Sequence, residues 1–261
     1  SAISMDVVPF ASAAGNRAQI TGVNVVIMDR SIQQEVFIAM CSNVKNIEKA
    51  WKQQNQVINR NLRKNDHNSA VLNTKMLALI FCAWSEAMFQ KLIHTPHGFD
   101  ISEITQIKNI KNKKSITNGW KKIIELGLNK TDFSKNSGGK ANIKQYLYKT
   151  IDDYVHEPSL LRNRIIHGQW LVALNSGNDA VNDKITDEIS NLDVVVITVW
   201  YNVWKTVAGI IESLIESPKR SFNRDYWSEY AKLDDYLRKV KQFSLDKKIS
   251  LLKKKPIITI D

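Results

Sequence analysis

Apolar residues recur every three or four positions over most of this chain, which is the period of an α-helix with one buried face. The first such stretch covers about residues 32–59. A second covers about 69–93 and ends at the turn-forming residues 95–98. Strand signals are scarce, and only residues 22–28 look briefly strand-like. The pattern predicts an all-α fold, an up-and-down helical bundle.

The helical period continues through the second half of the chain. Glu157-Pro158 breaks or restarts the chain, a further helix begins there, and Pro158 suits its first turn. Residues 175–179 predict a loop or short hairpin. A single long helix with one buried face follows over 187–216. Other helices are expected at about 101–110, 120–126 and 142–155.

These elements suggest three parts. Residues 1–30 form an N-terminal segment of uncertain structure, and residues 31–216 form the helical domain. Residues 217–261 are rich in aromatic residues and then in lysine, and they predict a C-terminal helical extension. The domain contains a basic insertion at about 101–150.

The positive charge is concentrated in that insertion. The chain has a formal charge of +11, and in residues 101–150 eleven lysines less three acidic residues give +8. Such a surface attracts polyanions, above all nucleic acid. The alternative is a lysine-rich surface that is merely solvated. The candidate phosphate-binding residues are Lys111, Lys113, Lys114, Lys121 and Lys122.

Cysteine and histidine usage predicts neither a disulfide framework nor a metal site. Cys41 and Cys82 both lie in apolar helical stretches, as expected of reduced, buried thiols in a cytosolic protein. His94 and His97 flank a turn, but a zinc site would need further ligands that the sequence does not offer. We therefore expect no metal and no other cofactor.

The uninterrupted apolar runs are short. The longest, such as Met76–Trp84 and Val194–Tyr201, fall well below the roughly 18 residues of a membrane span. No signal peptide is apparent either. The expected location is therefore the cytoplasm, without a membrane partner.

The most informative motif is the run Arg162-Asn163-Arg164-Ile165-Ile166-His167-Gly168. On a helix, Asn163 and His167 are four residues apart and share a face, whereas Arg162 lies about 140° around the axis from His167. A guanidinium binds phosphate oxygens, and an imidazole exchanges protons near neutral pH. The combination is suited to chemistry on a phosphodiester.

This run resembles the Arg-x(4–6)-His signature of the HEPN superfamily, whose members often have Asn after the Arg and Gly after the His. The apolar segment 77–89, with Glu86 as its single acidic residue, is similar to the core helix of that family. The resemblance covers about residues 70–215. It implies an all-helical, HEPN-like bundle.

The resemblance also implies an activity. HEPN nucleases are metal-independent endoribonucleases that dimerise, so that two motifs form one composite cleft. His167 would move protons, Arg162 would stabilise charge on the phosphoryl oxygens, and Asn163 would belong to the same site. The substrate would be unpaired RNA, cleaved to 2′,3′-cyclic phosphate and 5′-OH ends. The expected role is that of a toxin or antiviral effector, with an antitoxin or regulatory protein as a possible partner.

Several residues keep two interpretations at this stage. Glu86 either faces the bundle interior with Arg162 as its partner, along the stripe Leu72, Met76, Leu79, Ala83, Glu86 and Gln90, or is a capping or exposed residue. Arg164 either binds RNA or faces solvent. Tryptophans 170, 200 and 204 are expected in the core rather than as base-stacking platforms. For the whole chain, the rivals to an enzyme are a non-catalytic nucleic-acid- or protein-binding module and a subunit whose C-terminal tail docks onto another protein.

Overall fold

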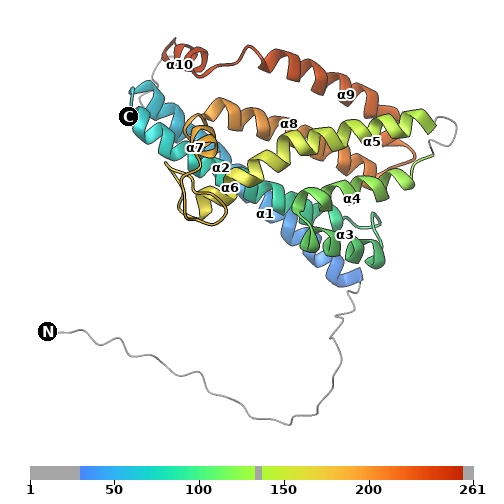
Figure 1. Cartoon of the computed structure of the whole chain (residues 1–261). Coiled ribbons are helices and arrows are strands. Elements are labelled where there is room, and N and C mark those ends of the chain that lie inside the picture. Colours follow the sequence, from blue (N-terminus) through green and yellow to red (C-terminus); the bar gives the residue numbers. More distant parts are fainter. Residues whose placement is uncertain (1–29, 133–136, 255–261) are drawn as a thin grey trace, which may run out of the picture.

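The computed structural model describes residues 30–132 and 137–254, and within these ranges it contains helices and no strand (Figure 1). An isolated bridge pairs Leu174 with Val181. The prediction of an all-α fold is therefore confirmed. The strand-like residues 22–28 lie outside the described residues. The helices are α1 (Arg30–Arg63), α2 (His67–Ile93), α3 (Ile101–Lys113), α4 (Ile116–Asn129), α5 (Ser137–Ile151), the π-helical segment η2 (Asp152–His156), α6 (Glu157–Ile166), α7 (Asp183–Ser190), α8 (Val194–Glu216), α9 (Ser221–Val240) and α10 (Leu245–Lys254).

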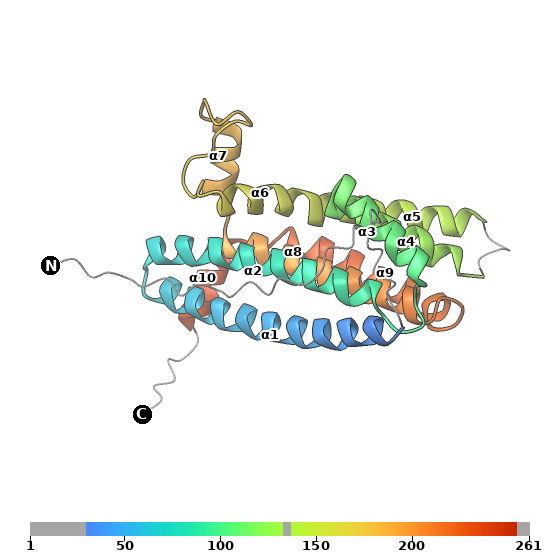
Figure 2. The same cartoon turned by 90° about the horizontal axis from the view of Figure 1, so that it is seen from below.

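The two longest helices, α1 and α2, form an antiparallel pair along the length of the molecule (Figure 2). Val44, Trp51 and Ile58 of α1 are buried at seven-residue intervals, which keeps them on one face of a straight helix. Helix α8 packs against α2 and completes the central layer. There Trp120 of α4 lies between Phe89 and Trp204, with ring centroids 5.3 and 4.8 Å away. Trp204 is thus a core residue, as predicted.

One of the predicted helices is divided in the structure. The stretch 187–216 is not one helix, because α7 ends at Ser190 and α8 begins at Val194. Asp193 separates them, since its carboxylate accepts hydrogen bonds from the amides of Val195 and Val196 and so caps a new helix. At Glu157-Pro158, by contrast, α6 begins where predicted, with Pro158 in its first turn, although the chain stays helical across this point. It passes from α5 through η2 into α6, and the wider π turn accommodates a proline that has no amide hydrogen to donate.

The C-terminal helices pack onto the bundle. Tyr230 of α9 stacks edge-on against Tyr146 of α5, with 4.5 Å between ring centroids. Lys253 of α10 donates a hydrogen bond to the side chain of Asn65, at the turn between α1 and α2. The described part of the predicted C-terminal extension, residues 217–254, is therefore helical and contributes Leu233 and Leu252 to the core, and residues 255–261 lie outside the described residues.

Helices α2 and α8 are each long and apolar enough to cross a membrane by length and composition. The uninterrupted apolar runs did not indicate this, because isolated polar residues divide them. Of the most apolar 18-residue windows, 56% of the residues in α2 and 50% in α8 are buried inside the structure. This degree of burial is also found in the core helices of soluble proteins.

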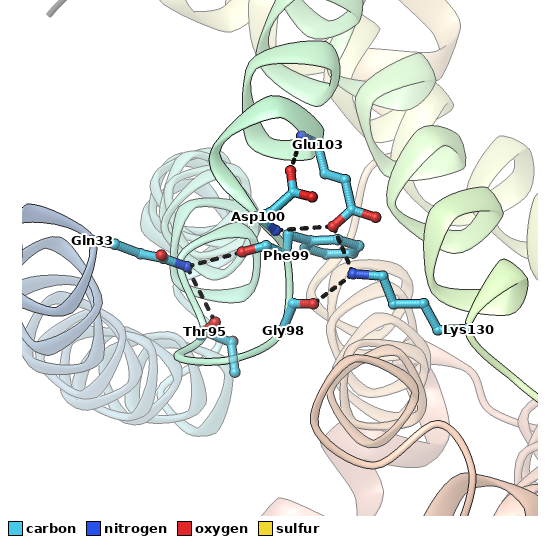
Figure 3. A network of polar contacts seen from close by, with 7 residues as sticks. All are labelled: Gln33, Thr95, Gly98, Phe99, Asp100, Glu103 and Lys130. Atoms are coloured by element: carbon cyan, nitrogen blue, oxygen red, sulfur yellow. Dashed lines mark hydrogen bonds and ion pairs between the residues drawn. The ribbon is translucent and has the colours of Figure 1, made fainter. Parts of the chain in front are cut away.

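A polar network ties three helices together at the α2–α3 turn (Figure 3). Gln33 of α1 donates to the carbonyl oxygens of Thr95 and Phe99. Lys130, directly after α4, donates to the Gly98 carbonyl at 2.7 Å and pairs with Glu103 at 2.6 Å. The carbonyl oxygens of Thr95, Gly98 and Phe99 in this turn thus all accept hydrogen bonds from side chains of α1 and of the residue after α4.

Gly98 in this turn leaves no space for a side chain. A Cβ atom built there would lie 2.4 Å from Cγ2 of Ile215 in α8. We expect Gly98→Ala to destabilise the fold by about 1–3 kcal/mol, as overpacked cores do. Gly209→Ala is the matched control, because a Cβ at Gly209 meets nothing within 4 Å. That helical substitution should stabilise the protein by up to about 1 kcal/mol. Chemical denaturation measures both, and equal effects would contradict the packing described.

Candidate active site

Helix α6, which contains the motif, lies against α2 and runs antiparallel to it (Figure 2). At its start, the Cys82 thiol contacts the carbonyl oxygen of Pro158. Beyond its end, Lys75 near the start of α2 donates a hydrogen bond to the carbonyl oxygen of Trp170. These two contacts fix the position of the motif on the bundle.

Arg162 points from α6 toward α2 and forms an ion pair with Glu86, with 3.3 Å between Nη1 and Oε1. Both side chains are about one-third to two-fifths exposed, so the pair resembles surface pairs that contribute at most about 1 kcal/mol. A phosphate could therefore share the guanidinium with Glu86 at small cost. The thiol of Cys82 is buried nearby, and its burial raises the pKa to about 12.

Glu86 thus pairs with Arg162, as one interpretation expected, and is partly exposed, as the other did; the interior orientation suggested for its stripe was wrong. Leu72 and Met76 are exposed rather than interior, and Glu86 is itself partly exposed. The reason is that α1 and α8 occupy the other faces of α2. This stripe is left on the outer side, next to α6.

His167 is the C-cap of α6 and not a residue inside it, which corrects the sequence-based placement. Its amide still donates to the carbonyl oxygen of Asn163 at 3.1 Å, so the two residues keep their shared face. Gly168 then reverses the chain with φ +80°, a conformation that residues with a Cβ rarely adopt. The imidazole is exposed at the end of the helix.

A cavity of about 860 Å³ opens beside His167, between α6, the loop after it and α7. Asn163, Arg164 and His167 line it from α6, and Ile185 and Glu188 line it from α7. Arg162 is not among the described residues that line this cavity. Within one chain, the structure therefore brings Asn163 and His167 together but places Arg162 on the other flank of α6.

Arg164 has a bonding role that neither sequence-based interpretation foresaw. Its Nη1 donates to the Leu174 carbonyl at 2.9 Å, while the Gln169 side chain accepts from the Leu174 amide at 3.0 Å. The Trp170 indole donates to the carbonyl of Ile165 at 2.8 Å. The loop after the motif is therefore held onto α6, and Trp170 serves packing and bracing, as predicted.

Sequence reasoning missed Lys75, whose side chain is buried in α2. Burial lowers its pKa, and its ammonium donates to the Trp170 carbonyl. Its position directly before the apolar run 76–84 is a signal that could have identified it. No comparable signal in the sequence marks Gln169 or Glu188.

The predicted phosphate-binding lysines are only partly available. Lys121 pairs with Asp152 at 2.6 Å and Lys122 with Glu125 at 2.7 Å, which neutralises part of the expected basic surface. Lys111 lies over the ring of Phe89. Lys113 and Lys114 are exposed at the end of α3. Helices α3 and α4 lie toward the opposite end of the molecule from α7, so these lysines do not adjoin the cavity beside His167 (Figures 1 and 2).

Comparison with family models, curated proteins and solved structures finds no match to this chain. Within the described ranges, no three His, Cys, Asp or Glu side chains are grouped so that they could hold a metal ion. An exposed imidazole beside an amide, with a guanidinium on the same helix, can bind a phosphodiester and transfer protons to and from it.

Proposed function

We propose that this protein is a HEPN-type endoribonuclease that cleaves unpaired RNA without a metal ion. The observation that carries the proposal is the exposure of His167 and Asn163 at a cavity, on the same helix as the half-exposed Arg162. The HEPN assignment itself depends on the motif and on the apolar α2 helix with Glu86. The proposed setting is the cytoplasm, where the enzyme would act as a toxin or antiviral effector.

The proposed reaction needs only the substrate and these side chains. An imidazole accepts the proton of the 2′-OH, whose oxygen attacks the adjacent phosphorus. The bond from phosphorus to O5′ breaks, and an imidazolium protonates the leaving oxygen. Arg162 stabilises the negative charge that develops on the phosphoryl oxygens. The products carry a 2′,3′-cyclic phosphate and a 5′-OH, and DNA is inert because it lacks the 2′-OH.

The separation of Arg162 from His167 supports a homodimer with a composite site. In such a dimer, the cavity beside His167 of one copy would face the side of α6 that carries Arg162 in the other copy. A two-fold axis would form this contact twice. Leu160 and Ile166, three residues before and after Asn163 on α6, are exposed, and so is Leu171 in the following loop. Such apolar residues around a polar site suit an interface.

The proposal is tested by incubating the purified protein with single-stranded RNA in excess EDTA. We expect fragments with 2′,3′-cyclic phosphate and 5′-OH ends, and no cleavage of the all-deoxy strand of the same sequence. Tight RNA binding without cleavage would favour the non-catalytic binding module, in which Arg162 and Arg164 have only the structural contacts described. Cleavage abolished by EDTA would contradict a metal-independent mechanism.

A further inference from the structure

The cavity beside His167 has features that the cleavage step does not use. It extends away from the imidazole to α7, and its volume of about 860 Å³ is within the range of small-molecule sites. Leu161, Val172 and Ile185 supply apolar walls. Phosphate contacts alone need no such space, whereas unpaired bases of RNA are commonly splayed out into pockets of this kind.

Two side chains of opposite charge, Arg164 and Glu188, line this cavity. Arg164 is held by the bond from its Nη1 to the carbonyl oxygen of Leu174, and its Nε and Nη2 atoms have no hydrogen-bond partner among the described residues. Glu188 on α7 is exposed and lines the cavity, and within the described part of the chain its carboxylate has no hydrogen-bond or ion-pair partner. The cavity thus offers a fixed guanidinium and a free carboxylate.

These two groups match the two edges of guanine. The O6 and N7 atoms of guanine accept two hydrogen bonds from arginine, which is the most common specific contact to this base. Its N1–H and N2 amino groups are donors, and a carboxylate only accepts. Adenine presents an amino donor where guanine has O6, and uracil and cytosine lack N7. A guanidinium and a carboxylate together therefore favour guanine over the other three bases.

We propose that this cavity is a nucleobase pocket that selects guanine next to the scissile phosphate, with Glu188 as the residue that determines specificity. The inference rests on the proposed ribonuclease function, because His167 lies at the same cavity. Its main prediction is a base preference in binding, which does not require cleavage. Arg164 is unsuitable for the test, since its replacement would also release the loop.

The test measures binding of short, labelled 2′-O-methyl RNA oligonucleotides, which cannot be cleaved, with a single guanine, adenine, cytosine or uracil in a fixed context. We expect the guanine oligonucleotide to bind about tenfold more tightly than the others, and Glu188→Gln to remove most of this preference. Asp187→Asn, the neighbouring exposed carboxylate that does not line the cavity, is the matched control and should keep the preference. Thermal melting verifies that both variants are folded.

The results separate the two proposals. Equal binding of all four oligonucleotides, a preference for another base, or an unchanged guanine preference in Glu188→Gln would overturn the pocket, even if the protein cleaves RNA. A guanine preference that depends on Glu188 would support the pocket even if no RNA is cleaved, and the failure would then lie in the catalytic assignment alone.

Discussion

Replacement of His167 by alanine is expected to lower the rate of RNA cleavage by about 10²- to 10⁴-fold, the range typical of positioned acid–base groups. The imidazole is exposed at the C-cap of α6, and its amide hydrogen bond to Asn163 does not depend on the side chain. The variant should therefore fold and melt like the wild-type protein. The measurement is the initial rate of cleavage of a labelled single-stranded RNA in EDTA.

His156→Ala is the matched control for this prediction. His156 is also exposed and precedes the other end of the same helix, but it does not line the cavity beside His167. We expect its cleavage rate to stay within about twofold of the wild-type rate. Equal rates for wild type and His167→Ala would remove His167 from the mechanism and would indicate a contaminating nuclease or a different site.

Replacement of Arg162 by alanine is expected to lower cleavage by about 10²- to 10³-fold, as observed when a group that stabilises transition-state charge is removed. Affinity for RNA should change much less, because many phosphate contacts contribute to binding. The loss of the half-exposed pair with Glu86 should cost the fold no more than about 1 kcal/mol. The comparison requires both the cleavage rate and the dissociation constant for a 2′-O-methyl RNA.

Arg238→Ala provides the control, since Arg238 forms an exposed ion pair with Asp234 on α9, away from the motif. Its rate should match that of the wild-type protein. A parallel loss of RNA affinity and cleavage in Arg162→Ala would instead show that this residue only holds the substrate. A large loss of thermal stability would show that its pairing with Glu86 is structural.

The helical period predicted the all-α fold because each helix buries one apolar face, and this signal is local. The boundaries that were wrong depended on single residues with local chemistry. Asp193 begins a new helix through a side-chain cap, and the turn at Gly168 leaves His167 as the C-cap of α6. A capping residue can end a helix even where the apolar residues continue at helical spacing. The spacing alone does not show whether the helix continues or ends there.

The candidate site was predictable in composition and less so in geometry. The spacing of Arg162 and His167 already implied an angle of about 140°, and the structure places them on different flanks of α6 accordingly. The cavity depends on how the loop and α7 fold back, through contacts such as that of Arg164 with Leu174. Such contacts between a helix and the loop that follows it leave no periodic pattern in the sequence. The sequence alone therefore could not assign Glu188 to the cavity.

The most direct test of the central claim is to mix the Arg162→Ala and His167→Ala proteins, each inactive alone, under conditions in which subunits exchange. If the composite cleft pairs Arg162 of one copy with His167 of the other, each mixed dimer keeps one of its two Arg162–His167 pairs. About a quarter of the wild-type activity should then return, because half of the dimers are mixed and each keeps one of the two pairs. No recovery in a mixture shown to contain mixed dimers, or full activity of a wild-type monomer, would contradict the composite site.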